Sequence, residues 1–361
     1  MNIKNNCRYF RGDLPCIPNK ENNFHCLSCD SFDEVKQKIL IIKLGAIGDV
    51  VRTTPILHKI KNLYPKALIY WLTHTPEILP NGFVDLKLKF DLKNILIVEE
   101  TEFDFVFNLD KDWEACALMN KIKSRVKKGY FLLNGKPAPL DNNAMHKYLT
   151  GIFDEESKNN KKHYIQEIFE ICDIGEFNDE HYIINKEELN DKEWEIDRYK
   201  KSIIGLNTGC GSRWQTRLWP ISYWKELSGK LIQLNYEVIL LGGEQEHERN
   251  LEISKETGAK YFGYYSIPIF IELIEQCDLI VTQVTMALHL AISLSKKVIL
   301  LNNIFNKNEF YLYNLGKIIE PPNGCDCYYA PKCYKEKDGN YSCMKDISVN
   351  EILKTIVELT S

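Results

Sequence analysis

The sequence has no long apolar run, no basic excess and no apolar leader, and each absence excludes a class of protein. No stretch of the 361 residues approaches the roughly 20 apolar residues that a membrane-spanning helix needs. The net charge of -4 gives no reason to expect a polyanionic partner such as nucleic acid. The opening residues, MNIKNNCRYFRGD, are too polar for a secretory signal. We therefore expect a cytoplasmic protein whose cysteines are mostly reduced.

The chain also lacks the Gly-x-Gly-x-x-Gly spacing of a dinucleotide-binding loop, but it contains a related pattern. Residues 39–42 form an unbroken apolar run that predicts a buried strand of a parallel sheet. Gly45, Gly48 and Asp49 follow, and then a predicted helix over 54–63. We expect Thr54 to be the N-cap of that helix. Its apolar face should comprise Ile56, Leu57, Ile60 and Leu63. Ligands bind at the carboxyl ends of such strands, so Asp49 is a candidate for chemistry, with an N-cap or turn role as the alternative.

The remaining pattern predicts two α/β domains, and 361 residues are enough for two cores. Apolar runs predict strands over 67–72, 95–98, 103–109, 203–206, 238–241, 279–281 and 298–301, with helices over 141–173, 223–234, 285–294 and 349–359. A polar segment over 176–200 marks the best domain boundary. We divide the chain into a cysteine module (1–37), a first domain (38–185), a second domain (186–322) and a cysteine tail with a final helix (323–361).

Eight of the cysteines lie in two short, loop-like segments at the chain ends. The first set is Cys7, Cys16, Cys26 and Cys29, and the second is Cys325, Cys327, Cys333 and Cys343. In a reducing compartment, four thiols in a segment with little core favour a closed tetrahedral metal site over disulfides. We expect structural zinc, with iron as the alternative, and no chemistry at either site. A loose reduced arm and packed free thiols are the competing interpretations.

The second domain carries features suited to a phosphate. Backbone amides of a loop over 207–212, including Thr208 and Gly209, could cradle the anion, and Arg217 could neutralise it. Thr285 precedes a predicted helix whose N-terminus would attract negative charge. Glu244, just after a strand, could accept hydrogen bonds from ribose hydroxyls. Ordinary turn chemistry is the alternative for each of them.

Taken together, four blocks resemble glycosyltransferase family 9, the ADP-heptose lipopolysaccharide heptosyltransferases. The blocks are ILIIKLGAIGDVVRTTPIL, GLNTGCGSRWQTRLWP, VILLGGEQEHE and VTMALHLAISLSKKVILL, followed by a tail ending in CMKDI. The resemblance implies a GT-B fold: two Rossmann-like, doubly wound domains facing across a cleft, here with cysteine-rich segments at both ends. It also implies inverting transfer of heptose from ADP-heptose to a glycan of the lipopolysaccharide-core type, without a catalytic cofactor.

The family's functional residues map onto this chain through those blocks. The resemblance makes Asp49 the general base, Arg217 the phosphate-binding cation and Glu244 the nucleoside contact, and assigns Thr285 and His289 to the donor phosphates. Because the first block lies on one domain and the others on the second, we expect the base and the phosphate-binding groups on opposite domains.

Two departures from the family pattern leave the substrates open. Val284 stands where the family has Asp, and the amino-terminal cysteine module is absent from well-known members. A related branch glycosylates serines of surface proteins and carries thiolate-bound iron, so a protein acceptor is an alternative. Peripheral association with the cytoplasmic membrane face is a further expectation. Two other classes remain: a nicotinamide-dependent oxidoreductase and a non-catalytic, metal-stapled scaffold.

Overall fold

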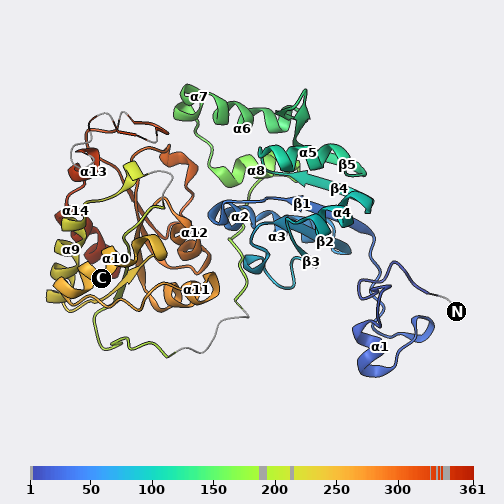
Figure 1. The fold of residues 1–361 in the computed structure, drawn as a ribbon, viewed down its shortest axis with the longest axis horizontal. Helices are drawn as coiled ribbons and strands as arrows, with labels where there is room; N and C mark the ends of the chain where they lie inside the picture. The colour runs from blue at the N-terminus through green and yellow to red at the C-terminus, as the bar shows by residue number, and fades with distance from the viewer. Residues whose placement is uncertain are drawn as a thin grey trace. The chain divides into compact units, whose positions relative to one another are not determined.

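The computed structural model describes residues 3–186, 193–211, 215–325, 327–330, 332, 333, 335 and 342–361. The chain divides into two compact units, each built on one β-sheet (Figure 1). The first unit comprises Met1–Gly45, Pro55–Tyr148 and Ile168–Glu180, and the second comprises Ala46–Thr54, Leu149–Glu167 and His181–Ser361. Residue 212 of the expected phosphate loop and part of the tail lie outside the described residues.

The sheet of the first unit has the strand order β3-β2-β1-β4-β5-β6. Its strands are β1 (Gln37–Ile42), β2 (Ala67–Thr73), β3 (Leu86–Lys89), β4 (Phe103–Asn108), β5 (Ser124–Leu133) and β6 (Lys136–Pro139). All pairings are parallel except that of β6 with β5. Ile39 to Ile42 are fully buried in β1, which confirms the expected central strand. The strands predicted over 67–72 and 103–109 are confirmed as β2 and β4.

The strand predicted over 95–98 is wrong, because these residues belong to helix α4 (Leu92–Glu100). Asp91 caps the helix by accepting a hydrogen bond from the amide of Asn94 at 2.9 Å. Leu96 and Ile97 are 56% and 42% exposed, so this apolar run is not buried on both faces as a central strand would be. A short apolar run alone cannot separate the two structures.

Two helices, rather than one, follow the glycine loop. Helix α2 (Ile47–Thr53) carries Asp49 in its first turn, and α3 (Ile56–Leu63) follows with Pro55 as its N-cap. The expected N-cap, Thr54, instead ends α2, where its hydroxyl donates to the Val51 carbonyl at 2.7 Å. In α3 the expected apolar face holds for three residues, but Leu63 is 48% exposed.

The other helices before residue 180 are distributed over the two units. They are α1 (Ile17–Asn22), α5 (Trp113–Lys121), α6 (Asn142–Ile152), α7 (Asp154–Asn159) and α8 (Tyr164–Cys172), with short 3-10 turns η1 (Cys26–Ser28) and η2 (Pro76–Ile78). The helical segment predicted over 141–173 is confirmed as three helices. Arg8 fastens the amino-terminal segment to this unit: its guanidinium pairs with Asp33 at 2.7 Å and with Asp85 at 2.5 Å, and donates to the Ala67 carbonyl at 3.0 Å.

The second sheet is wholly parallel, in the order β11-β10-β9-β7-β8. Its strands are β7 (Ile203–Asn207), β8 (Glu237–Leu241), β9 (Leu279–Gln283), β10 (Lys297–Leu301) and β11 (Gly316–Ile319). Its helices are α9 (Ile221–Gln233), α10 (His247–Thr257), α11 (Ile267–Gln276), α12 (Met286–Ser293), α13 (Ser342–Asp346) and α14 (Val349–Thr360), with turns η3 (Gln215–Arg217), η4 (Glu244–Glu246) and η5 (Lys307–Glu309). Every strand and helix predicted in this region is confirmed.

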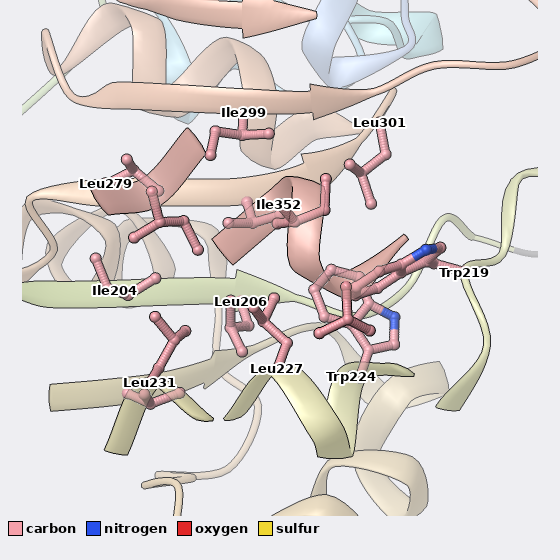
Figure 2. Packing of buried hydrophobic residues seen from close by; sticks show 14 of the residues in the cluster. Ile204, Leu206, Trp219, Trp224, Leu227, Leu231, Leu279, Ile299, Leu301 and Ile352 are labelled. Atoms are coloured by element: carbon pink, nitrogen blue, oxygen red, sulfur yellow. The ribbon is translucent and has the colours of Figure 1, made fainter. Parts of the chain in front are cut away.

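The core of the second unit packs α9 and α14 against the sheet (Figure 2). Trp219 and Trp224 meet edge to face, with ring centroids 4.8 Å apart. The Trp219 indole donates to the Ile347 carbonyl at 2.9 Å, which joins the loop after β7 to the carboxyl-terminal segment. Ile352 of α14 lies in the same cluster, so the final helix completes this core.

Candidate active site

Asp49 lies in the first turn of α2 and forms an ion pair with Arg52 one turn later. Its Oδ1 atom is 2.8 Å from Nη2 of Arg52. The Asp49 side chain is 34% exposed, whereas that of Arg52 is only 13% exposed. A carboxylate at a helix start is favoured by the helix dipole as well as by the guanidinium. The pair therefore presents an ionised carboxylate that solvent can reach.

Arg52 rests on an aromatic ring. Its guanidinium carbon lies 3.6 Å from the centroid of the Tyr164 ring, a cation–π contact. Burial is the largest influence and opposes the charged form of Arg52, but the charge of Asp49 together with Tyr164, Glu309 and Tyr182 outweighs it, so the pKa of Arg52 is raised. Tyr164 also contacts α2 through its hydroxyl, which is 3.0 Å from Oγ1 of Thr53.

Helix α2 packs directly on α12 through a glycine. A Cβ atom at Gly48 would lie 2.7 Å from Cδ2 of His289, so only glycine lets the ring approach. His289 is 5% exposed, and its Nδ1 atom is buried without a hydrogen-bond partner among the described residues. Burial, aided by the positive charge of Arg52, lowers the pKa of His289 to about 3, so the imidazole is neutral at physiological pH.

Tyr182 completes the polar surroundings of α2. Its ring centroid is 6.0 Å from that of His289, and burial raises the pKa of its hydroxyl, although Arg52 opposes the shift. Arg52, Tyr164 and Tyr182 were not predicted from the sequence. Arg52 could have been, because a residue three positions after Asp49 on a helix shares its face. The two tyrosines carry no local signal.

The expected donor-binding residues gather at the carboxyl edge of the second sheet. Asn207, the last residue of β7, donates from Nδ2 to Oγ1 of Thr285 at 3.3 Å and to Oγ1 of Thr282 at 3.0 Å. The Thr208 hydroxyl donates to Oδ1 of Asn250 at 2.6 Å. Thr285 is the N-cap residue of α12, so these contacts fix the loop after β7 against the start of that helix.

Gly209 lies in the loop after β7, and Glu244 lies in the loop after β8. A Cβ atom at Gly209 would lie 1.9 Å from Oε1 of Glu246, so the close approach of that carboxylate requires glycine. Glu246 in turn accepts from the Gly243 amide at 3.0 Å. Glu244 is exposed at the start of η4, where a ligand's hydroxyls could reach it.

Arg217 joins the loops that follow β7 and β9. It is 6% exposed, and it donates from Nη2 to the Cys210 carbonyl at 2.5 Å and from Nη1 to the Val284 carbonyl. Burial lowers the pKa of Arg217, partly offset by its contacts with Cys210. Val284, which replaces the Asp of the family pattern, thus contributes its backbone carbonyl rather than a carboxylate. The positive charge is held between the two loops that would surround a diphosphate.

Asp49 belongs to the compact unit that contains the second sheet. Residues Ala46–Thr54 belong to the compact unit of the second sheet, together with Arg217, Thr285 and His289. The base candidate and the phosphate-binding candidates therefore share one compact unit, although α2 follows β1 of the first sheet along the chain. The physical reason is the glycine contact between α2 and α12, which a local reading of the first βα unit cannot reveal. Their assignment to opposite domains stays a prediction.

Comparison with known proteins identifies the family of this chain. The profile of glycosyltransferase family 9 (heptosyltransferase) matches residues 95–314, more than half of the chain. The chain belongs to glycosyltransferase family 9. It is therefore a glycosyltransferase, which answers the oxidoreductase and scaffold alternatives. No curated protein matched the sequence.

Solved structures of glycosyltransferases share the fold. A family 9 glycosyl transferase from Veillonella parvula is 17% identical with a TM-score of 0.66, and the match covers 91% of this chain and 98% of that one. ADP-heptose lps heptosyltransferase II of E. coli is 15% identical with a TM-score of 0.59, covering 90% and 98%. The iron-containing dodecameric glycosyltransferase TibC of enterotoxigenic E. coli is 11% identical with a TM-score of 0.56, covering 90% and 76%. These matches confirm two Rossmann-like domains of the GT-B type.

The tail cysteines of this family 9 chain lie close to one another. Sγ of Cys343 is 3.5 Å from Sγ of Cys325, and Cys333 hydrogen-bonds to Cys327. The hydrogen bond between the two thiols lowers the pKa of Cys343 to about 6 and raises the pKa of Cys325. One thiol of the pair is thus poised to ionise, as a metal ligand must.

The amino-terminal cysteines are arranged more openly. Cys7 lies in a β-bridge with Glu34, Cys16 precedes α1, Cys26 begins η1 and Cys29 ends it. In the part of the chain that the structure describes, no group of three or more His, Cys, Asp or Glu side chains has an arrangement that could hold a metal ion. Both metal sites therefore stay predictions.

The first unit holds a buried ion pair that the sequence analysis did not predict. Nζ of Lys43 lies 2.9 Å from Oδ1 of Asp110 and donates to the Gly45 carbonyl at 2.8 Å. The other oxygen of Asp110 accepts from the Leu44 amide at 2.6 Å. Burial raises the pKa of the neighbouring Asp112, as does the charge of Asp110. The Lys43–Asp110 pair ties the end of β1, just before the Gly45–Gly48 loop, to the end of β4.

None of the helices in the described ranges could cross a membrane.

Proposed function

We propose that this chain transfers heptose from ADP-heptose to a glycan acceptor with inversion at the anomeric carbon, and that Asp49 is the general base. The observation that carries the proposal is the contact of Gly48 with His289. It brings the partly exposed carboxylate of Asp49 into the same unit as the helix that would bind the donor phosphates. Transfer chemistry needs both groups near one donor molecule.

The chemistry follows from the charges at the site. In an inverting transfer, a base takes the proton of the acceptor hydroxyl while that oxygen attacks the anomeric carbon. Arg52 holds one oxygen of Asp49 at 2.8 Å and favours the ionised form. The 34% exposure of the side chain lets an acceptor hydroxyl approach. Asp49 is thereby ionised, so that it can accept a proton, and accessible to the acceptor.

The leaving diphosphate gains negative charge as the sugar departs. We assign its stabilisation to Arg217, the amides of Thr208 and Gly209, and the N-terminus of α12. His289, being neutral, would donate a ring N–H rather than a charge, and Thr285 and Glu244 would contact phosphate and ribose. These protein groups would stabilise the negative charge of the leaving diphosphate. We therefore propose that catalysis needs no divalent cation.

Two acceptor classes fit the family. A glycan of the lipopolysaccharide-core type is our first proposal, because E. coli ADP-heptose lps heptosyltransferase II shares the fold. That acceptor would bring the enzyme to the cytoplasmic face of the membrane. A protein acceptor is the second, favoured by the paired tail thiols and by the fold shared with iron-containing TibC.

A structural metal in the tail is part of the proposal. Two sulfurs bound at about 2.3 Å to one tetrahedral zinc ion lie about 3.8 Å apart, and the 3.5 Å between Cys325 and Cys343 fits that arrangement. Cys327 and Cys333 are the candidates for the other two ligands, and they would have to move closer to the pair, because no three of the described side chains are arranged to hold a metal ion. A second site at Cys7, Cys16, Cys26 and Cys29 is the weaker proposal, since no contact between those thiols supports it.

The test is a turnover assay with ADP-heptose and two acceptors: heptose-free lipopolysaccharide, and serine-containing fragments of a surface protein. ADP release that depends on one acceptor identifies the acceptor class. Thermal protection by ADP-heptose, but not by GDP- or UDP-sugars, would establish the donor. Turnover with a different nucleotide sugar, and none with ADP-heptose, would refute the donor assignment.

A further inference from the structure

Four contacts around Asp49 form a closed ring. The Asp49 carboxylate pairs with Arg52 at 2.8 Å, and the guanidinium lies 3.6 Å from the centre of the Tyr164 ring. The Tyr164 hydroxyl is 3.0 Å from Oγ1 of Thr53, which donates back to the Asp49 carbonyl at 2.6 Å. The side chain of Asp49 is therefore held by Arg52 and its backbone carbonyl by Thr53, and Tyr164 contacts both of these neighbours. Such a ring restricts the carboxylate to one rotamer.

Arg52 is costly to keep in this position. Its Nε atom is buried and has no hydrogen-bond partner among the described residues. Leaving a buried donor unsatisfied costs free energy, and an apolar side chain of similar length would avoid that cost. Because packing alone would be better served by methionine, the guanidinium is explained by what it does to Asp49.

We propose that Arg52 is a positioning residue for the general base: it orients the Asp49 carboxylate and keeps it ionised, with the Tyr164 ring as its platform. The proposal rests on the assignment of Asp49 as the base. Loss of Arg52 should therefore slow the chemical step, while every contact with the nucleotide sugar is kept.

The charged and titratable groups near this pair come from several segments. Arg52 lies on α2 with Asp49, Tyr164 on α8, His289 on α12, Tyr182 in the segment after residue 180, and Glu309 at the end of η5. His289 is neutral above about pH 3, and burial holds the pKa of Tyr182 above its usual value. Of these groups, Arg52 is the one whose charge directly opposes protonation of Asp49.

The experiment measures the pH dependence of kcat and kcat/KM for ADP-heptose in Arg52→Met and Arg52→Lys, with heptose-free lipopolysaccharide or the serine-containing fragments as acceptor, whichever supports turnover. Arg52→Met should lower kcat about 10- to 100-fold while leaving ADP affinity by calorimetry unchanged. On the acidic side of the pH–rate profile, the pH at which activity is lost should rise by about one unit, because the carboxylate loses its cationic partner. Arg52→Lys keeps the charge but not the planar contact, so its acidic limb should stay while kcat falls. Arg125→Met is the matched control, because it removes an ion pair of an exposed arginine with Asp104. It should change neither kcat nor the pH dependence of kcat.

The outcomes separate this proposal from the one on which it rests. If Asp49→Asn keeps its turnover, the base assignment fails and the role of Arg52 fails with it. If Asp49→Asn is inactive but Arg52→Met keeps the wild-type kcat and acidic limb, only the role of Arg52 is refuted. Should methionine at position 52 prevent folding, Arg52→Lys decides, since a wild-type kcat in that variant would overturn the proposal.

Discussion

Gly48 gives His289 the space that its ring occupies: a Cβ atom at position 48 would lie 2.7 Å from Cδ2 of the imidazole. This contact joins α2, which carries the base candidate, to α12, which carries His289 and begins after its N-cap Thr285. The family motif Gly-Asp therefore has a packing explanation as well as a chemical one. The glycine sets the distance, and the aspartate that follows it supplies the carboxylate.

Gly48→Ala tests this contact. The added methyl group would press on a buried ring that has little room to move, so we expect a loss of about 1–3 kcal/mol in the free energy of unfolding, measured by urea denaturation. Gly229→Ala is the control, because a Cβ there meets nothing within 4 Å in the middle of α9. Adding His289→Ala to Gly48→Ala should recover part of the loss. A Gly48→Ala protein as stable as the wild type would show that the helices pack less closely.

His289 makes stability depend on pH. Its folded-state pKa of about 3 lies below its usual 6.5, so the unfolded chain binds more protons between these values. The free energy of unfolding should therefore fall as pH drops from about 6.5 toward 3, by up to about 1.4 kcal/mol per pH unit from this residue. His289→Gln should flatten that slope in urea titrations. His25→Gln, at an exposed position, should leave it unchanged. Equal slopes in wild type and His289→Gln would contradict the buried, neutral imidazole.

Arg217 is expected to contribute directly to donor affinity. Arg217→Ala should weaken ADP binding by about 1.5–3 kcal/mol, the scale of a hydrogen bond to a charged group. Arg217→Lys should recover only part of this, because lysine cannot reach the Cys210 and Val284 carbonyls with two separate nitrogens. Arg198→Ala, at an exposed position of the same unit, is the control. Calorimetry that finds wild-type ADP affinity in Arg217→Ala would place the phosphates elsewhere.

Much of the fold was predictable because buried parallel strands have a simple pattern. The runs at 39–42, 203–206 and 238–241 are apolar, short and bounded by turn residues, and all three are strands. The run at 95–98 looks the same, yet it is helical, since the cap at Asp91 and the exposure of its side chains are not visible in the run itself.

The site was only partly predictable for a different reason. Glycine loops and the residues behind them carry local signals, so Asp49, Arg217 and Thr285 could be named from the sequence. Tyr164 meets Thr53 across 111 positions, and Lys43 meets Asp110 across 67. Such pairs depend on strand order and helix packing, which no local pattern specifies.

The tail thiols should bind metal. We expect elemental analysis of the purified protein to find about one equivalent of zinc or iron at the tail site. Cys343→Ser should lose it, because this thiol is the one whose pKa is lowered, to about 6, by its neighbour. Cys277→Ser, at a buried packing position, should retain the metal. Metal-free wild-type protein with rapidly titrated tail cysteines would refute the site.

The central claim is that Asp49 is the general base, and the most direct test is the turnover of Asp49→Asn with ADP-heptose and its acceptor. Asparagine keeps the size of the side chain and can still contact Arg52, but it cannot take a proton. We predict a fall in kcat on the order of 10²-fold or more, with ADP affinity and thermal stability close to wild type. A kcat near that of the wild type would contradict the account.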